Sequence, residues 1–452
     1  MKKYLFIIGL VGTALFTACS SADDLVADIP SQGLTEEEKA MIVEAGQDSD
    51  VPITIGSVGS NRAITRKPID SGTGDLFEIT GTDGQYLGVF CLAQGVQAGA
   101  PDIDAIPDTD ADVKWNGTCQ HANWMENIPA KVLKHNASSD SPIDGGYSVD
   151  YSYVQFMKDD LSGTKVYYYP FGNWYYYDFF AYYPRQASVS TIAKSSSVDF
   201  TITGKEDIIW AHAAGGATVT DPVTSNSVKS YSAKYMRLSK EDLDGNGNPD
   251  HTEFEVVPGL AFEHKLTQFV FSIKPHDTDA AQLFAKGFAL TGMSLQNVYH
   301  KLRLIVASKA EETGNVAGTL SIFDTSASSG LADIQVSNPT DDSDPFGGGS
   351  TTIPVANTAG DTSTKLVGYA LVPSSDLIAD KAHNAHMVSI SLSQTSGDPV
   401  PDTVIPLTPP AGGFLAGHKY NITLEIYSPT NIQATATLTG WTNVAETVIG
   451  VD

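Results

Sequence analysis

The feature that most limits the fold of this chain is a succession of short runs rich in Val, Ile, Tyr, Phe and Thr. Gly, Asn, Asp, Pro and Ser interrupt these runs at intervals of roughly 8 to 15 residues. In one run, Val388, Ile390 and Leu392 alternate with other residues, the period-2 pattern of a strand with one buried face. The pattern predicts an all-β protein, too long for a single small β-sandwich. The clearest candidate strands are 86–93, 165–169, 175–183, 268–274, 386–393 and 419–426.

Helical signals are confined to two short stretches. Thr35 precedes three glutamates, which indicates an N-cap with acids in the first turn of a helix that runs to about Glu44. Residues 279–286 form the second candidate helix. A domain boundary is expected near residue 255, where an acidic stretch gives way to an apolar one. The longest polar interruptions are 219–230, 239–252 and 325–364, and the last of them predicts a long surface loop between strands of the second half.

The first nineteen residues have the layout of a bacterial lipoprotein signal. Lys2 and Lys3 precede an apolar stretch, Tyr4 to Phe16, that is too short to span a bilayer stably. Ala18 then stands directly before Cys19, as in a lipobox, although Phe16 departs from the usual Leu at its position. We therefore expect residues 1–18 to be removed and the Cys19 thiol to carry acyl chains such as palmitate. The alternative is an ordinary secretory signal with an incidental cysteine.

Charge and cysteine content fit an exported protein. The 27 Lys+Arg residues, less Lys2 and Lys3, against 53 Asp+Glu give the chain without its signal a formal charge of −28. Such a surface repels nucleic acid phosphates and anionic lipid headgroups, so nucleic acid is excluded as a ligand and lipid is the only membrane attachment expected. Two further cysteines, Cys91 and Cys119, could pair in an oxidising compartment, but they are too few for a disulfide scaffold.

Several stretches, in this order and spacing from residue 50 onward, resemble fimbrillins, the type V pilins of the Mfa-like group. The two acids after Cys19, Asp23 and Asp24, also resemble the signal that moves such lipoproteins to the cell surface. No single motif is diagnostic, whereas their order and spacing are fairly specific. The stretches are Pro52–Ile55, Asn61–Thr65, Tyr86–Phe90, YYYDFFAYYP at 175–184, DIIWA at 207–211, FEHKL at 262–266 and Gly413–Ile422, with Ile432 and Trp441 beyond them.

The resemblance implies two tandem transthyretin-like β-sandwich domains with Greek-key-type connections. It also implies assembly by donor-strand exchange: an arginine-specific protease removes the N-terminal segment with its first strand, and the empty groove accepts a strand from the next subunit. Head-to-tail contacts of this kind do not close on themselves, so they propagate as a fibre. The expected divisions are 1–18 for the signal, 19–62 for the propeptide, 63–255 for the N-terminal domain and 256–452 for the C-terminal domain.

The sequence offers a candidate for the removable strand and its cleavage site. Val51, Ile53 and Ile55 alternate with Pro52 and Thr54, so an extended strand here has one apolar face, and Pro52 suits a sheet edge. Arg62 follows directly on Gly59–Asn61, three small residues of a kind found in exposed, flexible stretches that proteases favour.

Cleavage after Arg62 would make Ala63 the new N-terminus. Arg66 is the second choice. The alternative is that both arginines lie in an ordinary surface turn.

The candidate donor strand lies in residues 432–451. Ile432, Ala434, Ala436 and Leu438 share one face of an extended strand, and Val448 to Val451 are a possible second strand. The alternative is that these residues are only the last strand of the second domain, with Trp441 in its core.

An acidic stretch, DLDGNGNPDHTE at 242–253, has the spacing of an EF-hand calcium loop. Gly247 permits the sharp turn, but Pro249 departs from the usual eighth residue, and strand-like sequence follows where a helix is expected. We therefore predict an EF-hand-like loop with a structural Ca²⁺, and the alternative is a polar connector with this spacing by chance. The candidate ligands are Asp242, Asp244, Asn246, Asn248, Asp250 and Glu253.

Other features give little sign of chemistry. The acids Asp102, Asp104, Asp108, Asp110 and Asp112 lack ligand spacing and are interpreted as a solvated loop. The aromatic residues of 167–183 are expected to place about half of their side chains in a sandwich core, and the exposed remainder could contact a glycan or a host protein. His121, His264 and His418 lie near apolar segments and are interpreted as packed or surface residues. No hydrolase elbow, zinc, Walker or C-x-x-C motif is present in the sequence.

The sequence therefore predicts a non-enzymatic subunit of surface fimbriae that requires no cofactor. It would be made as an outer membrane lipoprotein precursor and would then polymerise head to tail with related subunits at the cell surface. Its other expected partners are the arginine-specific protease and a surface receptor or glycan. A tip or anchor subunit is the alternative within this class, and a glycan-binding surface lipoprotein is the alternative from another class.

Overall fold

The computed structural model confirms that the protein is nearly all β. It describes residues 48–57, 79–81, 84–96, 123–135, 151–170, 175–192, 195–220, 227–238, 258–310, 312–336, 352–378, 386–410, 412–428, 430–440 and 447–449. The helices among these residues are short: α4 (Ala233–Leu238), α5 (Ala280–Ala285) and the 3₁₀ helix η3 (Ser375–Leu377). The α5 helix confirms the prediction for 279–286, and the predicted helix from Thr35 lies outside the described residues.

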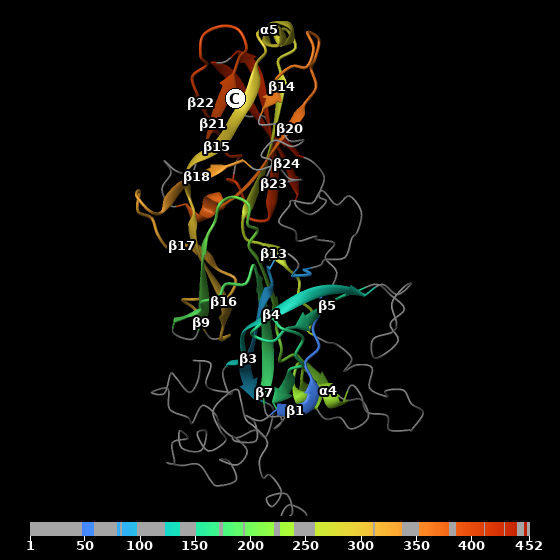
Figure 1. Ribbon diagram of the computed structural model, residues 1–452. Coiled ribbons are helices and arrows are strands. Elements are labelled where there is room, and N and C mark those ends of the chain that lie inside the picture. The colour runs from blue at the N-terminus through green and yellow to red at the C-terminus, as the bar shows by residue number, and fades with distance from the viewer. Residues whose placement is uncertain are drawn as a thin grey trace, which may run out of the picture.

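A seven-stranded sheet forms one end of the molecule (Figure 1). It is antiparallel between its named strands; β3 is the central strand, and β7 lies between β3 and β10. Beside it lie two small sheets, β1 (Asp48–Pro52) with β6 (Tyr168–Pro170), and β11 (Thr218–Thr220) with β12 (Ser227–Lys229). The large sheet has the order β13 (Glu263–His264), β10 (Ile209–Ala213), β7 (Tyr175–Tyr183), β3 (Leu87–Val96), β4 (Asn123–His135), β5 (Tyr151–Phe156), β2 (Gly56–Ser57).

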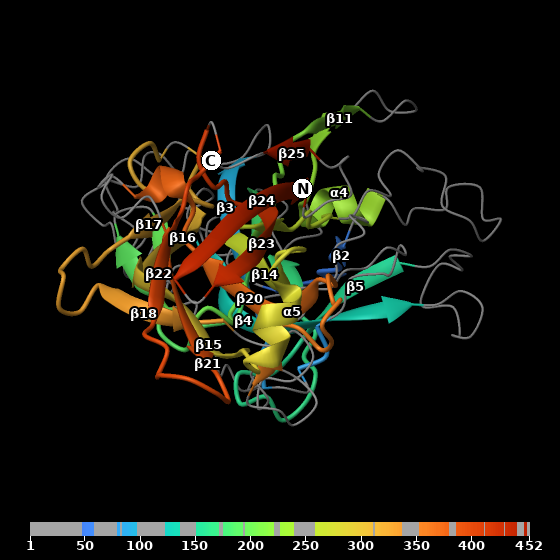
Figure 2. The same cartoon turned by 90° about the horizontal axis from the view of Figure 1, so that it is seen from above.

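Two five-stranded sheets pack face to face at the other end. In the first, β14 pairs in parallel with β23, and β24 and β25 follow toward the sheet edge (Figure 2). Its order is β20 (Lys365–Val372), β14 (Thr267–Pro275), β23 (His418–Ser428), β24 (Asn431–Gly440), β25 (Thr447–Ile449). The second has the order β18 (Leu331–Gln335), β15 (Ala289–Tyr299), β21 (His386–Ser393), β22 (Thr403–Leu407), with β19 (Ile353–Pro354) also paired to β15.

A four-stranded sheet between the two ends joins strands from both halves of the chain (Figure 1). In it, β9 pairs with β16, and Arg303 lies opposite Asp199. Only His300 separates β15 from β16, so one extended stretch passes from the C-terminal sheets into this sheet. The domain boundary near residue 255 stays a prediction, and this sheet contains strands from both sides of it. Its order is β17 (Leu320–Ile322), β16 (Lys301–Ser308), β9 (Ser195–Thr201), β8 (Ser190–Ile192).

Three hydrophobic cores follow from strand alternation. On β7, Phe179 faces one core together with β1, β6 and α4, whereas Phe180 and Tyr182 face a second core with β9 and β16. On β14, Phe269 faces the third core, between the two five-stranded sheets. The expectation that only about half of the aromatics of 167–183 are buried is wrong for β7, because layers cover both of its faces. Of the histidines interpreted as packed or surface residues, His264 is buried and His418 is partly exposed.

Two of the polar interruptions contain strands. Residues 219–230 include most of the β11–β12 hairpin, in which Val219 pairs with Val228 and the Val228 side chain is buried in the first core. The stretch 325–364 includes β18 and β19, because Ile334 and Ile353 pack into the third core. In both stretches, one or two apolar residues among many polar ones were enough to fix a strand. Five of the six predicted strands coincide in large part with β3, β7, β14, β21 and β23, whereas 165–169 overlaps β6 only at residues 168 and 169.

Candidate functional site

The N-terminal segment 48–57 is the element that the sequence singled out as removable. It is extended, with β1 at its start and β2 at its end. The side chains of Val51, Ile53 and Ile55 are buried, with exposed fractions of 5%, 5% and 0%, whereas Thr54 is exposed. The alternation predicted from the sequence therefore exists in the structure, and the apolar face points into the first core.

The backbone of this segment bonds to three separate stretches. The amide of Ile53 donates to the carbonyl of Tyr167 at 2.8 Å, and the carbonyl of Ile55 accepts from the amide of Val154 at 3.0 Å. The amide of Gly56 donates to Pro258 at 2.9 Å, and the carbonyl of Gly56 accepts from the amide of Leu260 at 3.0 Å. At Gly56 the segment thus lies between β5 and residues 258–260, with a bonding partner on each side.

Tyrosine and phenylalanine side chains line the core beneath this segment. Tyr167 meets Phe156 edge to face at 5.4 Å between ring centroids, and Tyr169 meets Phe179 edge to face at 6.0 Å. Burial raises the pKa of the Tyr169 hydroxyl well above its usual value, so this tyrosine is neutral. Burial also raises the pKa of the Cys91 thiol in the same core, with a smaller contribution from the negative charge of Asp178. The Cys91 thiol is thus protonated, and Cys119, its possible partner, lies outside the described residues.

The segment is held by groups that would remain behind if it were removed. Its loss would leave the amides of Val154 and Leu260 and the carbonyls of Tyr167 and Pro258 without these partners. It would also expose apolar surface that three buried aliphatic side chains now cover, each of which stabilises the fold by about 1.5–3 kcal/mol. The physical result is a groove with unpaired backbone on two sides and an apolar floor, a site suited to an extended peptide.

The candidate donor residues lie at the opposite end of the molecule. Ile432 and Ala436 on β24 are buried in the third core, and Ala434 is partly buried against it. β24 pairs with β23 along its whole length. In this monomer it is therefore a strand of the C-terminal sheet, as the alternative to the donor role predicts. Outside it, β25 pairs with β24 at Ala436–Leu438. The side chain of Leu438 and residues 441–446 and 450–452 are outside the described part.

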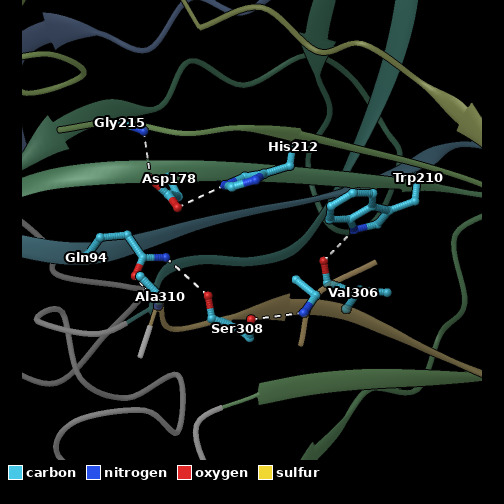
Figure 3. Close-up of polar contacts among 9 residues, drawn as sticks. Gln94, Asp178, Trp210, His212, Gly215, Val306, Ser308 and Ala310 are labelled. Carbon is cyan, nitrogen blue, oxygen red and sulfur yellow. Dashed lines mark hydrogen bonds and ion pairs between the residues drawn. The ribbon is translucent and has the colours of Figure 1, made fainter. Parts of the chain in front are cut away.

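Polar contacts tie the seven-stranded sheet to β16 (Figure 3). The indole Nε1 of Trp210 on β10 donates to the carbonyl of Val306 at 2.9 Å. The Gln94 side chain bonds twice, donating to the carbonyl of Ser308 at 3.1 Å and accepting from the amide of Ala310 at 2.8 Å. These bonds replace strand pairing between the two layers and fix their register.

Next to these bonds, a buried carboxylate holds a histidine (Figure 3). Asp178 Oδ2 lies 2.9 Å from Nε2 of His212, and Asp178 Oδ1 accepts from the Gly215 amide at 2.7 Å. The His212 ring stacks on Phe180 with centroids 4.4 Å apart. Among the described residues, this pair bonds further only to the Gly215 amide and to no serine, threonine or cysteine side chain, so we assign it to packing between β7 and β10.

Several predicted site residues lie outside the described residues. They include Cys19, Arg62, Ala63 and Arg66, the acidic cluster at 102–112, His121 and the whole predicted calcium loop with Asp242, Asp244, Asn246, Asn248, Asp250 and Glu253. Within the part of the chain that the structure describes, no cluster of three or more His, Cys, Asp or Glu could hold a metal. The same residues contain no helix that is long and apolar enough to cross a membrane.

The walls of the groove were missed from the sequence. Tyr153 and Val154 belong to β5, and Pro258 to Leu260 follow the predicted calcium loop, about a hundred and two hundred residues from Gly56 in the chain. A local pattern shows which face of a strand is buried but says nothing of its partner. The only available signal was the apolar stretch after residue 255, which was interpreted as the start of a domain.

Comparison with known proteins gives similarity at the level of solved structures. No protein-family model matches the chain, and no curated protein matches it. The chain is similar to a candidate cell adhesion protein from Bacteroides uniformis, at 14% identity and a TM-score of 0.39, over 87% of this chain and 99% of that one. A second candidate cell adhesion protein, from Bacteroides ovatus, has 10% identity and a TM-score of 0.38, over 89% of this chain and 98% of that one.

A third similar structure is the tip fimbrial protein Mfa3 from Porphyromonas gingivalis. It has 11% identity and a TM-score of 0.33, over 86% of this chain and 99% of that one. At these TM-scores, the similarities carry no argument about what this chain does.

Proposed function

We propose that the protein is a structural subunit of cell-surface fimbriae that assembles by strand exchange after proteolysis. The observation that carries the proposal is the N-terminal segment 48–57, which lies between β5 and residues 258–260 and buries Val51, Ile53 and Ile55. A cut after Arg62 would separate this segment from the rest of the chain. Its groove then offers backbone partners and an apolar floor to a strand from a second copy or a related subunit.

The donor in this proposal comes from residues 432–451. In the monomer, β24 and β25 are the last two strands at one edge of the C-terminal sheet, so they can leave it without breaking the pairing of β14 with β23. When β24 leaves the sheet, the buried side chains of Ile432 and Ala436 become exposed. Insertion into the groove of a neighbouring subunit buries donor side chains again. Exchange is favoured only when the acceptor groove is empty, which makes proteolysis the trigger.

The surrounding biology follows from the sequence resemblance. The precursor is exported with residues 1–18, lipidated at Cys19 in the outer membrane and released from its anchor when the segment up to Arg62 is removed. The protein acts by binding and assembly and not by catalysis. Incorporation of labelled palmitate into the full-length precursor, and its loss in a Cys19→Ala variant, tests the lipidation.

Limited trypsin digestion of the purified chain from Ser20 onward tests the assembly. We expect a stable product that begins at Ala63, or at Lys67 if Arg66 is cut, and a ladder of SDS-resistant oligomers. An Arg62→Ala, Arg66→Ala variant is the matched control and should stay monomeric at the same trypsin dose. A clipped chain without a ladder would favour a tip subunit. A chain whose segment resists cleavage and which stays monomeric would contradict the proposal and favour an anchor or a glycan-binding lipoprotein.

A further inference from the structure

Residues 258–266, called the linker below, connect the groove of the N-terminal segment to the C-terminal sheets. The linker begins at the groove wall, where the Gly56 amide and carbonyl bond to Pro258 and to Leu260. The side chains of Leu260 and Phe262 are buried in the same core as Val51, Ile53 and Ile55. The first third of the linker is therefore held by the segment whose removal is proposed above.

The middle of the linker is fixed to β10. His264 pairs with Ile209 as β13, and the amide of Lys265 donates to the carbonyl of Ile208 at 2.8 Å. The His264 Nδ1 atom lies 2.6 Å from Asp207 Oδ2, and both side chains are at least nine-tenths buried. These contacts bring together residues 207–211 and 262–266, two stretches that lie far apart in the chain and that both carry the sequence resemblance.

Lys265 extends this contact toward β16. Its ammonium group lies 4.7 Å from the ring centroid of Trp210. Trp210 in turn donates to the carbonyl of Val306, as Figure 3 shows. The linker thus contacts the same indole that ties the seven-stranded sheet to the four-stranded one.

The end of the linker holds the start of the strands that lead to β24. The carbonyl of Leu266 accepts from the amide of Gly417 at 2.9 Å, and the Thr267 hydroxyl donates to the carbonyl of Leu415 at 2.9 Å. β14 starts at Thr267 and pairs in parallel with β23, which pairs with β24. Only eight residues therefore separate Pro258, which bonds to the removable segment, from Thr267, at the head of the donor's sheet.

We propose that the linker transmits the removal of the N-terminal segment to the C-terminal sheet, so that a subunit becomes a better donor once it has become an acceptor. Removal takes away both bonds at Gly56 and the part of the first core that Val51, Ile53 and Ile55 supply, which weakens the attachment of the linker at its start. A buried amide that loses its partner favours local opening, and the linker has continuous contacts along which opening can spread. This coupling rests on the proposed strand exchange and would regulate it, because cleavage would make the donor strand easier to release.

Hydrogen exchange of the uncleaved chain from Ser20 onward, read by mass spectrometry, tests this coupling. Gly56→Pro removes the donor to Pro258 and leaves the three buried aliphatic side chains in place. Ile53→Val is the matched control, since it weakens the same segment by a similar amount on the side of Tyr167. We expect Gly56→Pro to speed exchange roughly fivefold in 258–275 and in 418–440. Ile53→Val should speed it only in 151–170.

Equal effects of the two variants, confined to 151–170, would overturn the coupling. Trypsin-cleaved protein, diluted to keep it monomeric, should show the Gly56→Pro pattern more strongly. Ladders without faster exchange in 418–440 would refute the coupling and leave strand exchange standing. Faster exchange in 418–440 without ladders at high concentration would support the coupling and contradict the strand exchange.

Discussion

Gly88 has no room for a side chain, because Tyr182 and Asn127 meet directly over it. A Cβ atom at this position would lie 2.3 Å from a ring carbon of Tyr182 and 2.4 Å from Asn127 Oδ1. The Tyr182 hydroxyl donates to that same Oδ1 at 2.8 Å, and the Asn127 side chain donates to the carbonyl of Gln186 at 2.8 Å. This buried network ties β3, β4 and β7 together where β4 carries an irregular residue, Asn127, with a φ of 51°.

We therefore expect Gly88→Ala to lower the free energy of unfolding by about 1–3 kcal/mol, since the added methyl group must displace the network. Gly163→Ala is the control, because nothing lies within 4 Å of its Cβ position. Urea unfolding followed by tryptophan fluorescence measures both. Equal stability of the two variants would contradict the close approach at Gly88.

His386 gives a pH dependence with a defined sign. Burial lowers its pKa from 6.5 to about 4, and its ring is packed edge-on near Phe269, with centroids 5.2 Å apart. Its Nε2 atom has no hydrogen-bond partner among the described residues. The unfolded chain binds a proton at this histidine below pH 6.5, whereas the folded chain does so only below about pH 4. Stability is therefore complete above pH 6.5 and falls as the pH drops through this window, by about 3 kcal/mol in total.

His386→Leu should remove this part of the acid sensitivity. The measurement is the free energy of unfolding in urea at pH 6.5 and at pH 4, for the wild type and the variant. We expect the wild type to lose about 3 kcal/mol more than the variant between the two conditions. Equal losses would show that His386 is not neutral in the folded state at pH 4.

Which residues of the site could be predicted depended on whether their signal was local. Val51, Ile53 and Ile55 were identified because a period of two is visible within five residues. Gly56 was not, because its role comes from Pro258 and Leu260, which no pattern near residue 56 reveals. For the same reason, the sequence indicated His264 only as a packed or surface residue and not as the partner of Asp207.

At the scale of single elements, the N-terminal segment makes a prediction that depends on cleavage. Ile55 is fully buried, so Ile55→Ala should destabilise the uncleaved chain by about 2–5 kcal/mol. After a cut at Arg62 and loss of the segment, the variant and the wild type have the same sequence and should have the same stability. Thermal unfolding before and after digestion measures this difference. Thr54→Ala is the control, since Thr54 is exposed and should change stability by less than about 0.5 kcal/mol.

The predicted calcium loop is a second element that can be tested by itself. Five oxygen-bearing side chains and the backbone carbonyl of Asn248, at EF-hand spacing, predict Ca²⁺ binding, and a bound ion would raise the unfolding temperature by mass action. Calorimetric titration of the chain from Ser20 onward should detect one site, which Glu253→Gln should weaken. The absence of binding at millimolar Ca²⁺ would support a simple polar connector instead.

Elements were predicted well where many apolar residues reinforced one another. The alternation in 386–393 gave β21 with its bounds, and 175–183 gave β7. The β11–β12 hairpin and β18 were missed because they are short and most of their side chains are exposed or only partly buried, so their strand state comes from pairing with neighbours. The burial of both faces of β7 was also missed, since it depends on β16, more than a hundred residues later.

For the whole molecule, the four-stranded sheet makes the two halves of the chain interdependent. Phe90, Phe180 and Tyr182 on the N-terminal sheet are covered by Leu302 and Leu304 of β16. A fragment of residues 48–257 should therefore expose these rings, bind the dye ANS and unfold without a cooperative transition. Adding a peptide of residues 299–323 should reduce dye binding, whereas the same peptide with Leu304→Asp should not. A soluble, cooperatively folded fragment that does not bind the dye would contradict this dependence and favour independent domains on either side of residue 255.

The direct passage of β15 into β16 has a mechanical consequence for a fibre. Tension between an N-terminal acceptor groove and a C-terminal donor strand would have to cross the middle of each subunit. There, β16 is paired with β9 over seven residue positions, with Arg303 and Asp199 joined by two hydrogen bonds of 2.7 and 2.8 Å. Force along these strands shears many hydrogen bonds at once, so they resist together and do not open one after another. Such a subunit would lengthen little under flow and would fail at its exchanged strand before its middle unfolds.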